Sequence, residues 1–353
     1  LHPARQAEPL APSSQQPAPA FSPSQFQTTS PSNEKKIMVA PEDSAVHVKE
    51  KARFICSGRH DENQIMAAIN LLGSRPGIVE LQAGTFHCSG TLILPPGITL
   101  QGGGPDKTIL QFEEPDQMVS ILINQPGITL RNLSVTGHGS IRISASHTKL
   151  EGIGSRSDLP QKDPNSISRT AAFEVLGSVM PVRDVSFLNC SASGADRDGF
   201  ALKCVTPALN LTNITLEGCR TIDCGLSVNG AGYLVSRVQN VTFKNCTDEG
   251  SFIGWIIENQ SGQITIADSI STSNRQWALC LSNSHHLSIT GFHQIDQPGA
   301  SGSQSMNGNP GEAAAVSSPV TDSTFELIGQ GKSKLPLINE AGDRNRYSLI
   351  QKP

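Results

Sequence analysis

The sequence is poor in charged and aromatic side chains, and it lacks any long apolar run. Charged residues make up 16% of the 353 residues and aromatic residues 5%. This composition disfavours coiled coils and charged helical bundles, while 32 glycines and 23 prolines favour a chain with many turns. A membrane-spanning helix needs roughly 18 to 20 consecutive apolar residues, and no stretch approaches that length, so we expect no transmembrane segment.

Basic runs and closely paired cysteines are also missing. The net charge is -4, and no Lys/Arg run is interleaved with aromatic residues, so nucleic acid is not an expected partner. The eight cysteines include no C-x-x-C pair, which argues against a zinc ribbon. The chain begins with Leu1 rather than Met, which fits the removal of a signal peptide. We therefore expect a secreted, extracellular or cell-surface protein.

Proline, serine and glutamine dominate the first 45 residues, which have almost no apolar periodicity. A segment of this composition cannot build a core, so residues 1–45 are predicted to form an extended arm. Because such an arm does not order itself, we expect it to dock on other copies of the chain. Self-association through the arm is therefore one predicted interaction.

A short amphipathic helix is predicted over residues 61–73. Asp61 stands as an N-cap with Gln64 as its capping-box partner, and Ile65, Ile69 and other apolar residues follow at helical spacing before a glycine. After residue 77 the apolar residues alternate, which is typical of strands.

A weak repeat of strand-like segments then runs through the chain. Each copy alternates mostly apolar residues with others, and its fifth residue is always Gly, Asn or Asp, the types that enter the left-handed region at least cost. From Asn189 onward the fifth residues are 23 to 29 positions apart, the length of one coil of a wide solenoid. The fifth residues are Gly102, Asn132, Gly152, Asn189, Gly218, Asn245, Asp268 and Gly291.

Cysteines follow three of these turns, at Cys190, Cys219 and Cys246. Coils of a solenoid stack about 4.8 Å apart, so these side chains are predicted to form a ladder of buried thiols inside it. Cys56 and Cys88 flank the predicted helix and the first strands, and they are the more plausible disulfide pair.

The segments Phe54–Cys56, Asp61–Ile69, Gly77–Phe86 and Gly97–Gly102 resemble the entry of pectin-lyase-like right-handed parallel β-helix proteins. The resemblance covers about residues 50 to 295 and implies an all-β solenoid capped by a short α-helix. We expect the β-helix domain to span residues 46–295 and residues 296–353 to form an irregular C-terminal cap. The fold hosts polysaccharide lyases, polygalacturonases, uronate epimerases, phage tailspikes and adhesins, so function has to be argued from a site.

Known catalytic signatures of that fold are not found. Gly137-His138-Gly139 is similar to the Gly-His-Gly of polygalacturonases, but the acidic clusters that should precede it are missing, and a surface histidine in a glycine turn is the better interpretation. The Arg-x-Pro-x-x-Arg signature of pectate lyases is also missing.

Acidic residues gather at one predicted edge of successive coils. Three interpretations stay open: solvated turn residues paired with arginines, a cation site for Ca²⁺, or an acid/base pair for glycan cleavage. The residues concerned are Asp196, Arg197, Asp198, Asp223, Asp248, Glu249 and Arg275.

Two further sets of residues are candidates for contact with sugars. Trp255 and Trp277 lie on adjacent predicted coils, where they could stack on a glycan or fill the interior. Sequons outside the turn column are the candidates for glycosylation, namely Asn210, Asn213, Asn240 and Asn259.

The sequence thus favours a structural, self-assembling or glycan-contacting surface protein without a recognisable active site. The alternative is a lyase, epimerase or hydrolase acting on acidic polysaccharides, with the acidic edge as its working face.

Overall fold

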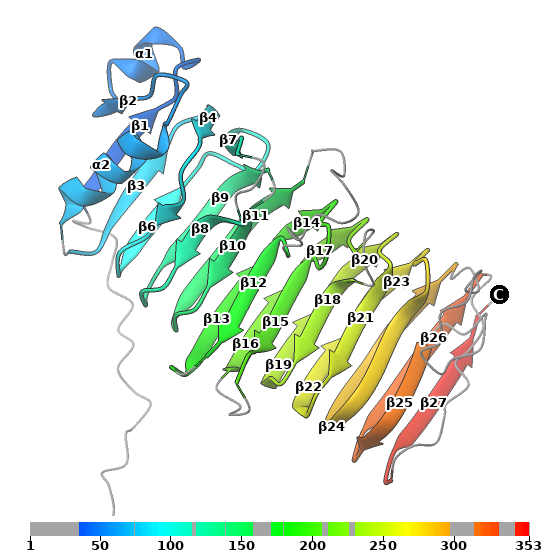
Figure 1. Cartoon of the computed structure of the whole chain (residues 1–353). Helices are drawn as coiled ribbons and strands as arrows, with labels where there is room; N and C mark the ends of the chain where they lie inside the picture. The colour runs from blue at the N-terminus through cyan, green and yellow to red at the C-terminus, as the bar shows by residue number, and fades with distance from the viewer. Residues whose placement is uncertain are drawn as a thin grey trace, which may run out of the picture. The chain divides into compact units, whose positions relative to one another are not determined.

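The strands wind into repeated coils, and successive coils pair in parallel on three faces (Figure 1). This arrangement was found in a computed structural model, which describes residues 35–73, 75–114, 118–137, 139–157, 171–178, 180–206, 211–225, 230–296, 314–331 and 343–352. Most of the predicted arm therefore lies outside the described residues, as do His138 and Asn210.

Face 1 carries the strands that precede the predicted turn column. Neighbouring strands pair in register, so like positions stack from coil to coil. Its members are β1 (Lys35–Ala40), β3 (Gly77–Leu81), β6 (Ile98–Gln101), β9 (Thr129–Thr136), β11 (Thr148–Arg156), β13 (Val182–Leu188), β16 (Leu211–Glu217), β19 (Gln239–Lys244), β22 (Ser261–Ala267), β24 (Trp277–Ile295), β26 (Thr324–Gln330) and β27 (Arg346–Gln351).

Face 2 follows the turn column, and β9, β11, β24 and β26 bend through that turn to reach it. Its other strands are β4 (Gly84–Cys88), β7 (Thr108–Phe112), β14 (Ser191–Ser193), β17 (Arg220–Ile222), β20 (Thr247–Glu249) and β23 (Ile270–Thr272).

Face 3 closes each coil, and β24 begins on it. Its other strands are β5 (Leu92–Ile93), β8 (Val119–Ile123), β10 (Ser140–Ile143), β12 (Phe173–Gly177), β15 (Phe200–Cys204), β18 (Ala231–Ser236), β21 (Ile253–Glu258) and β25 (Ala314–Thr321).

The predicted turn column is confirmed from Asn132 onward. All seven of its residues from Asn132 to Gly291 have positive φ, for example 52° at Asn189 and 58° at Gly291. Gly102 is the exception, because its φ is not positive. A Cβ at Gly102 would lie 2.3 Å from the Asn132 carbonyl oxygen, so close packing of the next coil explains this glycine.

The N-terminal boundary differs from the prediction. Residues 35–40, assigned to the arm, form β1 and pair with β3 and with β2 (Phe54–Ile55). Alternate apolar residues of β1 are buried, which gives this segment a place in the core that its proline-rich neighbours lack. A four-residue helix, α1 (Val46–Lys49), follows it.

The predicted cap helix is confirmed as α2 (Glu62–Leu72), with Ile65, Ala68 and Ile69 fully buried. The predicted capping box is wrong. The Asp61 carboxylate instead accepts hydrogen bonds from the backbone N–H groups of Ser57, Gly58 and His87. It therefore fastens the loop before the helix to the first coil.

The C-terminal part is more regular than predicted. Within residues 314–331 and 343–352, strands β25, β26 and β27 continue the parallel pairing of all three faces. The coils thus extend past residue 295, with irregularities in register where β25 and β26 pair with β24.

The interior of the coil is apolar and layered. Phe173, Phe200, Tyr233 and Trp255 stack along face 3 with neighbouring ring centroids 4.5 to 5.4 Å apart. The cysteine ladder is confirmed, since Cys190, Cys219 and Cys246 are at most 1% exposed. Stacking of like residues on a 4.8 Å repeat explains both columns.

Candidate functional site

The structure separates the residues of the predicted acidic edge into buried and exposed groups. Asp198 and Asp248 are each 1% exposed, whereas Asp223 and Glu249 face solvent. Glu249 forms an ion pair of 2.6 Å with Arg220 on the preceding coil. Asp196 is half-buried, and Arg197 and Arg275 are exposed. The edge is therefore not one continuous carboxylate surface.

Asp248 belongs to a polar network inside the coil. Thr221 and Ser251 each donate a hydroxyl hydrogen bond of 2.6 Å to its Oδ1, and the Asn274 amide donates to its Oδ2. Burial raises the pKa of Asp248 to about 6, although these hydrogen bonds oppose the shift. A fully buried and fully bonded carboxylate of this kind holds coils together rather than meeting a substrate.

Asp198 lies just before β15 and is less completely bonded. Its Oδ1 accepts a 2.9 Å hydrogen bond from Ala231 N–H, and its Oδ2 lies 3.3 Å from Arg197 Nε without hydrogen-bond geometry. Burial raises the pKa of Asp198 to about 6, against the opposing effects of Arg197 and Lys203. Asp198 is therefore a carboxyl group that can hold a proton near neutral pH.

Arg142, Glu174 and Lys203 form a charged cluster on the outward side of face 3. Glu174 pairs with Arg142 and with Ala201 across neighbouring strands, and Lys203 is two residues beyond Ala201 on the same side of β15. Arg142 Nε lies 2.6 Å from Glu174 Oε2, and Lys203 Nζ lies 2.6 Å from Glu174 Oε1. We call these three residues the face 3 cluster.

Glu174 is held as a carboxylate within this cluster. Burial by itself would raise the pKa of Glu174, but hydrogen bonds and charge from Lys203 and Arg142 outweigh it and lower the pKa. Asp198 and Glu174 thus have pKa values shifted in opposite directions, and both interact with Lys203. Divergent pKa values of this kind are what acid/base chemistry requires.

Sequence reasoning found Asp198 but missed the face 3 cluster. The sequence did contain a signal for it: each of two otherwise apolar strands carries one charged residue, Glu174 in Phe173–Gly177 and Lys203 in Phe200–Cys204. These strands are separated along the chain, so only the coil register shows that their charges meet.

Both tryptophans are buried, which is incompatible with glycan contact at the surface, but only Trp255 fills the interior of the coil. Trp255 is 0% exposed within the aromatic stack, and Trp277 is 2% exposed in a second apolar cluster with Ile253 and Ile256. Neither ring presents a face to solvent for a sugar.

The remaining predicted sites have mixed outcomes. All eight cysteines are buried free thiols, so the predicted Cys56–Cys88 disulfide is not formed. Asn213, Asn240 and Asn259 are exposed but adopt positive φ and hydrogen-bond through their amides, so backbone geometry explains them too. Their glycosylation stays a prediction.

Metal-binding geometry does not occur in the described part of the chain. No three His, Cys, Asp or Glu side chains come together there in a way that could hold a metal ion. Binding of Ca²⁺ at the acidic edge stays a prediction. Nor does any helix among them have the length and apolarity to cross a membrane.

Comparison with solved structures decides the fold. The A-module of Azotobacter vinelandii mannuronan C-5 epimerase AlgE4 superposes with a TM-score of 0.57 at 16% identity, covering 84% of this chain and 93% of that one. The AlgE6 A-module of the same organism gives 0.54 at 15%, covering 84% and 97%. The chain has the pectin-lyase-like right-handed parallel β-helix fold.

A third β-helix comparison supports the same fold. The GH136 lacto-N-biosidase of Eubacterium ramulus superposes with a TM-score of 0.53 at 10% identity, covering 90% of this chain and 68% of that one. No family model matches the sequence, and no curated protein matches it significantly. At these identities the pectin-lyase-like fold is shared, and activity has to be argued from the site.

Proposed function

We propose that this chain is a secreted or cell-surface β-helix protein that contacts an acidic glycan through the outward side of face 3. The face 3 cluster carries this proposal. Arg142 and Lys203 share one carboxylate, which leaves one net positive charge, in a chain whose net charge is -4. Their side chains are 29% and 23% exposed, so both reach solvent.

Glu174 gives the two cations a fixed geometry. Its carboxylate is 9% exposed and bonds each cation through a different oxygen. Arg142 and Lys203 have further N–H donors beyond those used on Glu174. A glycan carboxylate or sulfate would therefore meet donors already held in place, which lowers the entropic cost of binding.

Titration of the purified protein with an acidic and a neutral polysaccharide tests this proposal. Polygalacturonate and alginate should bind, with affinity that falls as salt rises, because the attraction is between charges. Dextran should not bind at face 3. Binding of the acidic polymers that is independent of salt would overturn the proposal.

The second candidate is a polysaccharide-active enzyme that works at the same face. The observation that favours it is the divergence of the Asp198 and Glu174 pKa values. In this account Asp198 would be the general acid and Glu174 the general base, with Lys203 close to both. Turnover of an acidic polymer that is lost in Asp198→Asn, and retained in Asp223→Asn on the exposed turn, would support it.

Self-assembly through the N-terminal arm also remains a proposal. The composition of residues 1–34 supports it, since a proline-rich segment without apolar periodicity gains order only from a partner.

A further inference from the structure

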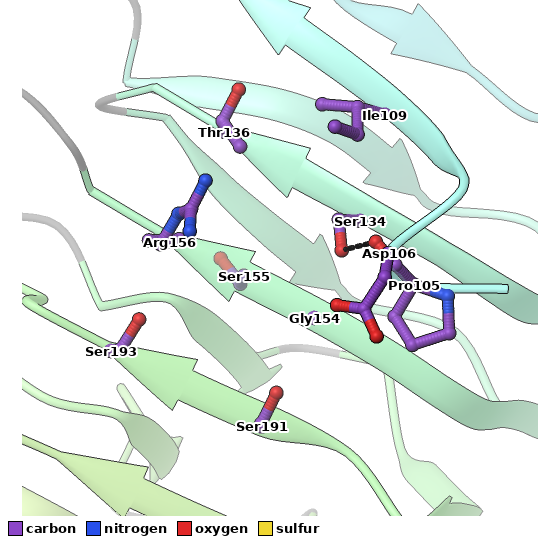
Figure 2. A pocket seen from close by; sticks show the side chains of 10 residues that line it. All are labelled: Pro105, Asp106, Ile109, Ser134, Thr136, Gly154, Ser155, Arg156, Ser191 and Ser193. Carbon is purple, nitrogen blue, oxygen red and sulfur yellow. Dashed lines mark hydrogen bonds between the residues drawn. The ribbon is translucent and has the colours of Figure 1, made fainter. Parts of the chain in front are cut away.

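A groove of about 440 Å³ runs across face 2, between the Pro105–Asp106 turn and strand β14 (Figure 2). Side chains from four successive coils line it, on β7, β9, β11 and β14. Ser134 donates a hydrogen bond to the Pro105 carbonyl and so fastens the wall of the groove to its floor.

Small residues at one outward position create the groove. On face 2 this position is occupied, coil by coil, by Ile109, Ser134, Gly154, Ser191 and Arg220. The three central residues are small, while a large residue closes the row at each end. A Cβ at Gly154 would lie 2.7 Å from Ser134 Oγ, so this glycine keeps the centre of the floor open.

The lining is chemically suited to a polyhydroxylated ligand. Hydroxyl groups of Ser134, Ser191 and Ser193 lie along the floor; a serine hydroxyl can both donate and accept a hydrogen bond, and Ser134, whose proton is donated to Pro105, can still accept one. Arg156 and Asp106, the charged residues of the lining, lie apart in Figure 2, and their opposite charges leave the lining with no net charge. Pro105 and Ile109 add an apolar surface at one end.

From this chemistry we infer that the face 2 groove binds an uncharged oligosaccharide. Sugar hydroxyls would exchange hydrogen bonds with the serine row, accept them from Arg156 and donate them to Asp106. The C–H side of one ring would pack on Pro105 and Ile109. An acidic sugar would meet the Asp106 carboxylate as well as Arg156, so the groove offers it no net positive charge. The groove is thus a site separate from the face 3 cluster, and it has the opposite ligand preference.

Calorimetric titration of the full chain with cellohexaose, maltohexaose, mannohexaose and hexagalacturonate tests the inference. At least one neutral hexasaccharide should bind, with little dependence on salt. Ser191→Phe should weaken that binding at least tenfold, because the ring would fill the groove. Arg156→Gln should weaken it several-fold through the loss of hydrogen-bond donors.

Thr247→Phe is the matched control, because Thr247 occupies the same outward row two coils further on and lies outside the groove. It should leave affinity unchanged. Three results would overturn the inference: no neutral hexasaccharide binds, Ser191→Phe binds as well as Thr247→Phe, or only hexagalacturonate binds at the groove. Glu174→Gln separates this site from face 3, since it should alter acidic-glycan binding alone.

Discussion

Lys203 Nζ lies 2.6 Å from Glu174 Oε1, and the two residues occupy neighbouring strands of face 3. They are 29 positions apart in the sequence, and only the coil register brings them together. The same register brings Arg142 to the other carboxylate oxygen. The face 3 cluster is therefore a product of the solenoid and not of a local motif.

Asp248 makes the stability of the fold depend on pH. Its folded pKa is about 6 against an ordinary value of 3.8, so the folded state holds the proton more tightly. Stability is then highest below pH 3.8 for this group, and it falls as pH rises towards 6. We expect the free energy of unfolding in urea to fall between pH 5 and pH 7.5, and to fall less in Asp248→Asn.

Comparing the native protein with Asp248→Asn between pH 5 and pH 7.5 isolates the effect of Asp248, because all other titratable groups are present in both. Glu174, whose pKa is lowered, titrates below this window and does not contribute to the difference. An equal pH dependence in the native protein and the variant would show that Asp248 is already ionised without cost.

Tyr233 and Tyr347 offer a matched pair for the interior. The Tyr233 hydroxyl is buried and donates to the carbonyl oxygens of Cys219 and Thr247 at 2.9 and 3.0 Å. Tyr233→Phe should lower the free energy of unfolding by about 1–3 kcal/mol, because buried acceptors lose their donor. Tyr347 is 40% exposed, so Tyr347→Phe should have no measurable effect in the same urea titration. Equal effects would contradict the interior assignment.

All eight thiols should resist modification in the folded protein. Burial raises the pKa values of Cys56, Cys224 and Cys280 to about 12, so almost no reactive thiolate exists at pH 8. Iodoacetamide should label none before unfolding and eight after unfolding in guanidinium, counted by mass spectrometry. Six labelled thiols without reductant would instead indicate the Cys56–Cys88 disulfide.

Deletion of the arm separates assembly from folding. Removal of residues 1–34 should leave the unfolding midpoint unchanged and abolish any self-association seen by size exclusion. Removal of residues 1–45 should also destabilise the chain, because β1 supplies the buried residues Ile37, Val39 and Ala40. A protein that is monomeric with and without residues 1–34 would contradict assembly through the arm.

Much of the fold was predictable because every coil makes the same tight turn at the same position, and few residue types adopt the backbone conformation of that turn without strain. The turn column needs positive φ, and Asn189 and Gly218 show that requirement in the sequence. The site was less predictable. Asp198 and Asp248 look alike as residues in acidic turns, yet Asp248 is bonded inside the coil and Asp198 lies near Lys203. Which of them meets other charges depends on register between distant strands.

The tryptophans illustrate the same limit. Trp255 alternates with Ile253 and Ile257, but the strand is apolar on both of its sides. The alternation therefore does not show whether Trp255 points into the coil or away from it. Face 3 has apolar residues outward at Leu234 and Ile256 as well as inward, so periodicity alone could not place the ring.

Binding of polygalacturonate by Lys203→Met, compared with Lys149→Met, tests the central claim most directly. Lys149 is an exposed lysine on face 1, so its loss removes the same charge away from the face 3 cluster. We expect Lys203→Met to bind at least tenfold more weakly than the native protein, with a smaller dependence on salt, and Lys149→Met to bind normally. Thermal melting of both variants checks that each remains folded. Equal affinity of the two folded variants would contradict glycan contact at face 3.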